Sequence, residues 1–148
     1  MKIALASDHA GFALKDELAA WLRDGGHVVL DLGTNSTESV DYPDFGARLA
    51  NAVASGEADR GVAVCGSGIG ISIAVNRNPR CRCARVDDPL SARLAREHND
   101  ANVLALGGRL IGADMARACV TEFLGTDFAG GRHQRRVDQL SRLLQESD

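Results

Sequence analysis

Short, almost continuously apolar runs alternate along the chain with longer segments in which apolar residues recur at helical spacing. The runs at 2–7 and 61–65 carry apolar residues on both alternating faces, which is typical of strands buried on both sides of a parallel sheet. Between them, Leu14, Leu18 and Leu22 form a helical stripe, with Lys15 expected on the opposite, polar face. This alternation predicts repeated strand–helix units, which restricts the chain to the α/β class.

Five expected strands and the helices between them define the architecture. Gly25-Gly26 ends the first helix, and Asp88-Pro89 begins the fourth as an N-cap followed by a first-turn proline. Right-handed crossovers then predict a Rossmann-like three-layer α/β domain with a five-stranded parallel sheet. The strands are expected at residues 2–7, 27–32, 61–65, 82–86 and 102–106.

A last helix is expected over residues 133–145. Its apolar residues Val137, Leu140 and Leu144 are expected to face the protein, which adds a C-terminal helix to the domain. No linker, repeat or low-complexity segment interrupts the 148 residues. We therefore expect residues 1–148 to form a single domain.

Composition and charge exclude several classes of function. Apolar residues make up 45% and charged residues 25%, as in an ordinary globular protein. No apolar run approaches the roughly 18 residues of a membrane-spanning helix, and the N-terminus is apolar too briefly for a signal peptide, so a cytoplasmic location is expected. The net charge of -3 argues against a nucleic-acid binder. The basic segment 132–136 is either a solvated helix face or a site for a small anion.

The four cysteines have neither the spacing of a disulfide framework nor that of a zinc site. Cys81 and Cys83 share a face of an expected strand, but no Cys-x2-Cys pair or neighbouring histidine pair completes a metal site. Cys119 lies among apolar residues of an expected helix and is interpreted as a core residue. We expect no metal and no cofactor.

Polar residues follow three of the expected strands. Asp8 and His9 come after the first strand, Cys65 ends the third, and Gly107-Gly108-Arg109 follows the fifth. Ligands of doubly wound sheets bind beyond the carboxyl ends of the strands. These residues are therefore expected to meet at one edge of the sheet, as a candidate site.

The segment 65–70, Cys-Gly-Ser-Gly-Ile-Gly, is the most informative. Its glycines let backbone N–H groups converge at a helix N-terminus, which could hold a phosphate or an enediolate oxyanion. A tight strand-to-helix turn and a dinucleotide-binding loop are the alternatives, although Ile71 stands where the latter needs its last glycine. Cys65 lies next to these N–H groups, where a thiolate would be stabilised, and this favours a functional cysteine over an inert one.

Further polar residues suit proton transfer and anion binding. His98 and Asn99 close the fourth expected helix, where the histidine could complement the helix dipole or transfer protons. Arg132 and Arg136 are four residues apart, so a helix presents both on one face. Together with Arg109, they offer forked donors to a phosphate.

Five segments, in this order through nearly the whole chain, resemble ribose-5-phosphate isomerase type B. The wider group also contains galactose-6-phosphate and allose-6-phosphate isomerases. Each segment is weak by itself, and it is their order that is specific. The segments are Asp8-His9-Ala10-Gly11, Asp41-Tyr42-Pro43, Cys65-Gly66-Ser67-Gly68-Ile69-Gly70, His98-Asn99-Asp100-Ala101-Asn102-Val103-Leu104 and Gly130-Gly131-Arg132-His133.

The resemblance implies a metal-free isomerisation of ribose 5-phosphate and ribulose 5-phosphate through a cis-enediolate. Cys65 would move a proton between C2 and C1, and Ser67, where many relatives have threonine, would help proton transfer at the sugar oxygens. His98 would open the furanose ring with help from Asp8. The substrate-binding residues would be His9, Tyr42, Gly66, Gly68, Ile69, Gly70, Asn99, Arg109, Arg132 and Arg136.

Some relatives lack the cysteine and use a glutamate after the last glycine, where this chain has Ile71, so the thiolate version is implied. The resemblance also implies a homodimer or homotetramer in which His98 and the C-terminal arginines complete a partner's pocket. Two alternatives stay open. The substrate could be a six-carbon sugar phosphate or a free rare sugar, decided by the pocket near Tyr42, or the chain could be a phosphate-binding module without catalysis.

Overall fold

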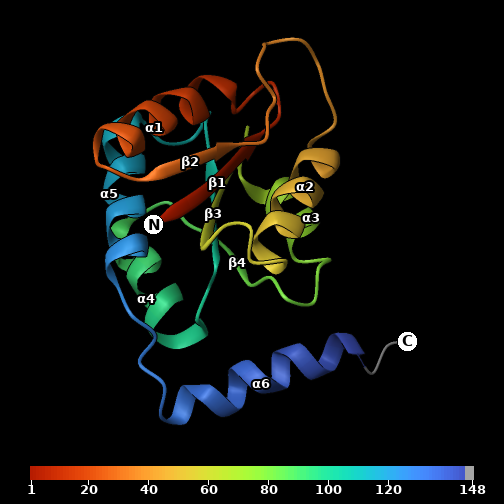
Figure 1. Cartoon of the computed structure of the whole chain (residues 1–148), viewed down its shortest axis with the longest axis vertical. Coiled ribbons are helices and arrows are strands. Elements are labelled where there is room, and N and C mark those ends of the chain that lie inside the picture. Colours follow the sequence, from red (N-terminus) through yellow and green to blue (C-terminus); the bar gives the residue numbers. More distant parts are fainter. Residues whose placement is uncertain (146–148) are drawn as a thin grey trace.

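The computed structural model describes residues 1–145, with side chains described through residue 143. Within these residues the chain forms a five-stranded, all-parallel sheet between two layers of helices (Figure 1), which confirms the predicted α/β architecture. The elements in chain order are β1 (Lys2–Ser7), α1 (Phe12–Asp24), β2 (Val28–Asp31), α2 (Tyr42–Ala54), β3 (Arg60–Cys65), α3 (Ile69–Val75), β4 (Cys83–Arg85), α4 (Pro89–Asn99), β5 (Val103–Gly107), α5 (Ala113–Gly125) and α6 (Arg132–Gln145).

The predicted N-cap of the fourth helix acts as expected, and the helix after Cys65 is short. Asp88 caps α4 by accepting the Ser91 N–H at 2.7 Å, a bond that also lowers the pKa of its carboxyl. The helix after Cys65, α3, ends at Val75, before the Asn78-Pro79 pair. The N–H groups of Arg77 and Asn78 bond to carbonyls three positions back, so the chain tightens into turns before the proline.

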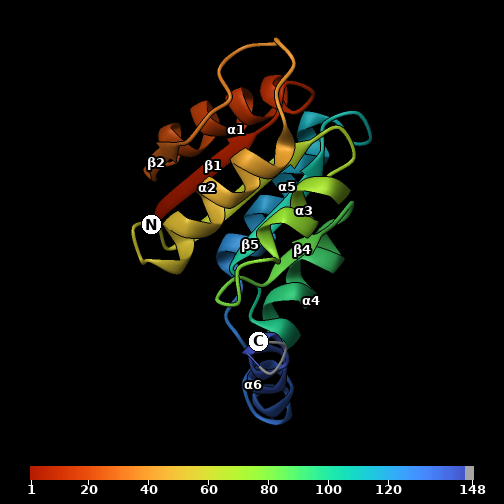
Figure 2. The same cartoon turned by 90° about the vertical axis from the view of Figure 1, so that its right-hand side faces the viewer.

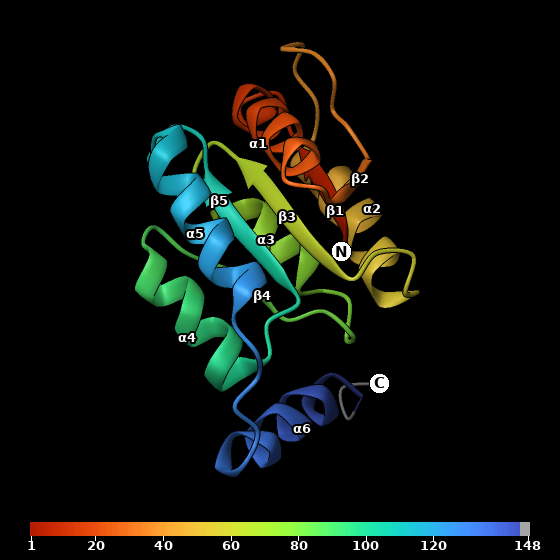
Figure 3. The ribbon, with the colours of Figure 1, turned by 60° about the vertical axis from the view of Figure 1, so that its left-hand side comes forward.

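The strand order is β2-β1-β3-β5-β4. From β1 the chain moves outward to β2 on one side, and then crosses to β3 and the remaining strands on the other. The direction therefore changes between β1 and β3, whose carboxyl ends frame the crevice where doubly wound sheets bind ligands. Figure 3 shows β3 and β5 side by side at the centre of the sheet.

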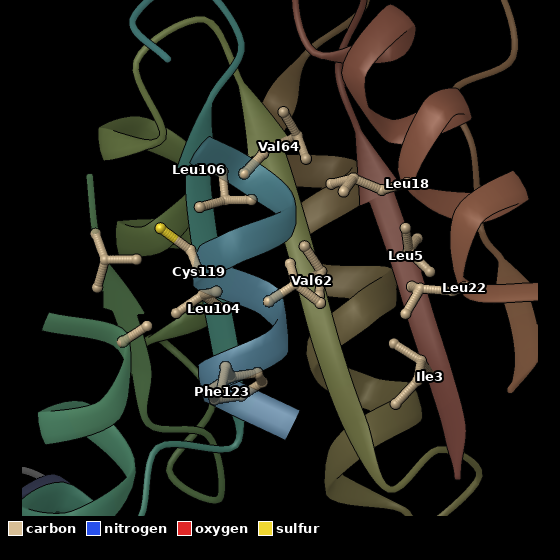
Figure 4. Packing of buried hydrophobic residues seen from close by; sticks show 14 of the residues in the cluster. Ile3, Leu5, Leu18, Leu22, Val62, Val64, Leu104, Leu106, Cys119 and Phe123 are labelled. Atoms are coloured by element: carbon tan, nitrogen blue, oxygen red, sulfur yellow. The ribbon is translucent and has the colours of Figure 1, made fainter. Parts of the chain in front are cut away.

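The two faces of the sheet have different cores. Ile3 and Leu5 point toward α1, α4 and α5, whereas Ala4 and Ala6 point toward α2 and α3, because successive strand residues face opposite sides. Figure 4 shows the first cluster, in which large side chains of β1, β3 and β5 pack against residues such as Leu18 and Phe123. The second face is lined by smaller side chains.

Lys15 is not on the polar face of α1 as predicted, because its side chain is 0% exposed. Its ammonium donates to both carboxylate oxygens of Asp31, at 2.7 and 2.9 Å, and to Oδ1 of Asn35 at 3.1 Å. Asp31 also accepts the Gly33 N–H at 3.0 Å. One buried charge therefore joins α1 to the end of β2 and to the loop 32–41 that follows it.

The last helix, α6, extends away from the sheet beside the C-terminal end of α4 (Figures 1 and 2). Val137 is buried, but Leu140 is 46% exposed, so the prediction that Leu140 faces the protein is wrong for the chain by itself. The side chain of Leu144 lies outside the described residues. In the described part of the chain, no helix is long and apolar enough to cross a membrane.

We expect Asp31→Ala to lower the free energy of unfolding by about 3–5 kcal/mol, because the buried Lys15 ammonium would lose its counter-charge. Urea unfolding followed by circular dichroism measures this change. Asp114→Ala is the matched control. It breaks an exposed pair with Arg117, for which a loss of about 0–1 kcal/mol is expected. A loss below about 1 kcal/mol for Asp31→Ala would show that Lys15 does not depend on this carboxylate.

Candidate active site

A pocket of about 400 Å³ opens at the carboxyl edge of the sheet, beside the crevice between β1 and β3. It brings together eight of the residues selected from the sequence, drawn from four separate segments. The residues that line it are Asp8, His9, Ala10, Tyr42, Cys65, Gly66, Ser67, Gly70, Arg109 and Leu110.

Cys65 is the last residue of β3 and lies where the strand turns into α3. The N–H of Gly68 donates to its Sγ at 3.1 Å, at the positive end of the α3 dipole. The Cys65 carbonyl accepts the Gly108 N–H at 2.8 Å, and the Gly66 carbonyl accepts the Arg109 N–H at 3.0 Å. The backbone of Cys65 is therefore held by the loop that follows β5, and its sulfur accepts an N–H from its own loop.

The other three cysteines lack this environment. Burial raises the pKa of Cys81 to about 11 and that of Cys119 to about 11, and it also raises the pKa of Cys83. These thiols stay protonated at neutral pH. Among the four cysteines, all within the described residues, only the Cys65 sulfur accepts a backbone N–H.

The loop after Cys65 lies directly on the end of β5, and two glycines make this possible. Gly68 has φ +76, and a Cβ there would lie 2.8 Å from the carbonyl carbon of Leu106. A Cβ at Gly107 would lie 2.8 Å from the Ser67 backbone. The sequence is therefore glycine-rich here because two backbones meet, and the same contact fixes the position of the sulfur.

The N–H groups of this loop are not all directed into the pocket. Gly68 donates to Cys65, and Ile69 donates to the Ser67 hydroxyl at 3.2 Å. Gly68 and Ile69, which the sequence selects as substrate-binding residues, do not line the pocket. Their N–H groups bond to Cys65 and Ser67 within the loop. Gly66, Ser67 and Gly70 are the residues of this loop that line the pocket beside Cys65.

Asp8 and His9 are positioned by the turn after β1. The buried Asp8 carboxylate accepts the Gly11 N–H at 3.0 Å. Nδ1 of His9 accepts the Val40 N–H at 3.2 Å, so the ring proton of the neutral imidazole lies on Nε2. His9 thus offers a donor to the pocket and also fastens the end of the loop 32–41.

Tyr42 and Arg109 form the walls of the pocket. The Tyr42 ring lies so close to Gly70 that a Cβ there would approach within 2.7 Å of the ring. The Arg109 side chain lies over Gly66, where a Cβ would be 3.4 Å from its Nη1. An aromatic ring and a guanidinium therefore lie against two different glycines of the cysteine loop and line the pocket beside it.

The remaining predicted residues, His98, Asn99, Arg132 and Arg136, do not reach this pocket. His98 and Asn99 end α4, which runs antiparallel to the strands, so they lie at the opposite edge of the sheet. A five-residue strand such as β5 separates the two edges by roughly 15 Å. Figures 1 and 3 show α6, which carries both arginines, at the same far end.

These far residues form a second cationic group. The rings of His98 and His133 stack with centroids 4.4 Å apart and an interplanar angle of 15°. The pKa of His133 is lowered, first by partial loss of solvent and then by the positive charges of His98, Arg132 and Arg136, so its imidazole stays neutral near pH 7. His133 was not among the predicted site residues, although its place in the basic segment 132–136 was a signal for it.

We expect Gly68→Ala to lower the free energy of unfolding by about 1–3 kcal/mol, because alanine is strained at this φ and would collide with β5. Urea unfolding measures the change. Gly125→Ala is the matched control. This helical glycine has nothing within 4 Å of an added Cβ, and alanine should be neutral or stabilising there. Equal stability of Gly68→Ala and the native chain would contradict the backbone contact.

Known proteins are similar to this chain in both sequence and fold. A family model described as Ribose/Galactose Isomerase matches residues 3–140. Ribose-5-phosphate isomerase B of Escherichia coli (strain K12) is 46% identical over 144 residues, which cover 97% of each chain. The solved structure of Clostridium thermocellum ribose-5-phosphate isomerase B matches with a TM-score of 0.99 and 49% identity over 100% of both chains.

A further similar solved structure holds a bound ligand. It is ribose-5-phosphate isomerase B from Mycoplasma genitalium with bound ribulose 5-phosphate, which is 38% identical, has a TM-score of 0.94 and covers 98% of this chain and 97% of its own. The chain described here belongs to the ribose/galactose isomerase family.

Proposed function

We propose that this protein interconverts D-ribose 5-phosphate and D-ribulose 5-phosphate through a cis-enediolate, with Cys65 as the base. The observation that carries the proposal is the Cys65 sulfur in the pocket, with the Gly68 N–H donating to it at 3.1 Å. Similar proteins along the full chain are named ribose-5-phosphate isomerase B. These names support a pentose phosphate as substrate over a six-carbon one.

The α-proton of a sugar is weakly acidic, so its removal needs a base and support for the oxyanion at the same time. The Cys65 thiolate takes the proton from C2 of the open-chain aldose, and the electrons of that bond form the C1=C2 double bond while O1 becomes anionic. The backbone of Gly66 and Gly70 faces this oxyanion. The Ser67 hydroxyl moves a proton between O2 and O1, and the Cys65 thiol returns its proton to C1, giving the ketose.

The two groups of predicted residues lie at opposite edges of the sheet, so the pocket of one chain does not contain the complete set of side chains. We infer that the site is shared in a homodimer. In that arrangement the partner subunit's His98 opens the furanose ring with Asp8, and the partner subunit's Asn99 contacts the sugar. The phosphate lies between His9 and Arg109 on one side and the partner subunit's Arg132 and Arg136 on the other.

The surface beside α6 has features that favour contact with a second copy of the chain. A pocket of about 450 Å³ lies between α6 and the β4 edge of the sheet. It is larger than the Cys65 pocket but contains no residue of it, and its lining includes Cys81, Ala84 and the half-exposed Leu140. Apolar side chains of this kind are typical of a subunit interface rather than of a free surface.

We expect Cys65→Ala to lower kcat by roughly 10²–10⁴-fold, the contribution of a general base. Ribose 5-phosphate followed by NMR in heavy water tests this. The native protein should form ribulose 5-phosphate with deuterium at the transferred carbon, because the base exchanges its proton with solvent. Cys119→Ala, which removes a buried thiol outside the pocket, is the matched control and should remain active. Failure of the native protein to convert ribose 5-phosphate would rule out the proposed reaction.

The shared site makes a separate prediction. Cys65→Ala and His98→Ala chains carry different tags, and mixed dimers are isolated through both. Each mixed dimer holds one site with both lesions and one intact site, so it should have about half of native activity. Mixed dimers of Cys65→Ala and Asp8→Ala are the control and should stay inactive, because both lesions lie in the same half-site. Equal inactivity of both mixed dimers would place the complete site within one chain.

A further inference from the structure

The peptide group between Ser67 and Gly68 makes a hydrogen bond through its N–H and another through its carbonyl oxygen. Its N–H donates to the Cys65 sulfur at 3.1 Å, and its carbonyl oxygen accepts from Nε of Arg85 at 3.0 Å. The bond is not among the cis peptides of the chain, and the C=O and N–H of a trans peptide point in opposite directions. Whatever fixes the carbonyl on one side therefore fixes the N–H that reaches the sulfur on the other.

The residue after this peptide, Gly68, allows a wider range of backbone conformations than a residue with a side chain. Gly68 tolerates both signs of φ, so the orientation of this peptide is set by its packing on the end of β5 and by its two hydrogen bonds. A half-turn of the peptide would place the Ser67 carbonyl oxygen beside the Cys65 sulfur. That oxygen would repel a thiolate, and the N–H that favours the thiolate would be lost.

The position and bonding of Arg85 suit it to hold the Ser67 carbonyl in place. It is the last residue of the edge strand β4, and its side chain is 26% exposed. Its Nη1 is bonded to the Asp87 carboxylate, which leaves Nε directed to Ser67. A hydrogen bond from a charged guanidinium is about twice as strong as a neutral one. Two anchors on one planar fork also fix its orientation.

We infer that Arg85 is a positioning residue for Cys65. It holds the Ser67–Gly68 peptide in the orientation that aims an N–H at the sulfur and keeps the carbonyl away from it. Arg85 does not line the pocket, so its effect on turnover passes through this peptide and not through contact with the sugar. The catalytic consequence rests on the proposed function, whereas the effect on the sulfur does not.

The test compares native protein with Arg85→Leu, Arg85→Lys and Asp87→Asn. The rate of Cys65 alkylation by iodoacetamide is measured without substrate at one pH, by mass spectrometry of the Cys65 peptide. We expect Arg85→Leu to slow alkylation roughly tenfold, the effect of one charge-assisted hydrogen bond. It should lower kcat for ribose 5-phosphate by a similar factor and leave KM within about twofold. Arg85→Lys should recover part of both rates, because an ammonium can still donate to the carbonyl.

Asp87→Asn and Arg117→Leu separate this role from general effects of charge and folding. Asp87→Asn removes the ion pair but keeps the Arg85 donor, and Arg117→Leu breaks a comparable arginine–aspartate pair on α5. Arg117→Leu should alkylate at nearly the native rate, and Asp87→Asn should be slowed far less than Arg85→Leu, because it loses one anchor but keeps the donor to Ser67. The inference is overturned if Arg85→Leu alkylates within twofold of native protein, or if Asp87→Asn is slowed as much as Arg85→Leu. An increase in KM with native alkylation would also overturn it.

Failure of this inference can be distinguished from failure of the proposed function. If the native protein does not convert ribose 5-phosphate, the isomerase proposal fails, but the alkylation rates still decide whether Arg85 acts on the sulfur. If conversion occurs and the alkylation rates of the variants are native, the isomerase proposal stands and the role of Arg85 does not.

Discussion

The contact between the loop after β3 and the end of β5 is the constraint on which the rest of the site depends. Gly68 and Gly107 let the two backbones approach to a distance that a side chain would prevent. Because they touch, the N–H groups that follow β5 can bond to the carbonyls of Cys65 and Gly66. The position of the sulfur, the wall formed by Arg109 and the reach of Arg85 all follow from this approach. A site built on strand ends is rigid because the sheet itself is its support.

The geometry of parallel α/β units also explains why the predicted site residues lie in two separate groups. A helix between parallel strands runs back toward the strand origins, so the C-terminal end of α4 cannot lie at the carboxyl edge of the sheet. His98 is therefore separated from Cys65 by the length of the strands. α6 extends the same end with a cationic face. Two copies related by a two-fold axis would bring each end to the other chain's pocket, which is the arrangement we propose.

A buried ion pair connects stability to the shape of the pocket. Lys15 fastens the loop 32–41 at its start through Asp31 and Asn35, and His9 fastens its end through Val40. The loop leads directly into Tyr42, the aromatic wall of the site. A fully buried ammonium is costly by itself, but here it receives three oxygen acceptors, so it fixes one conformation of an otherwise long connection.

The sequence by itself determined the α/β class, the strand–helix order and most element boundaries, because hydrophobic periodicity and turn residues are local signals. It also identified Asp8, Cys65 and Arg109 as neighbours, because strand ends share one edge in a parallel sheet. Only the tertiary structure decided that β5 lies between β3 and β4, that Lys15 is buried, and that His98 lies far from Cys65. These facts depend on how distant segments pack against one another, and no local pattern of side chains records that packing.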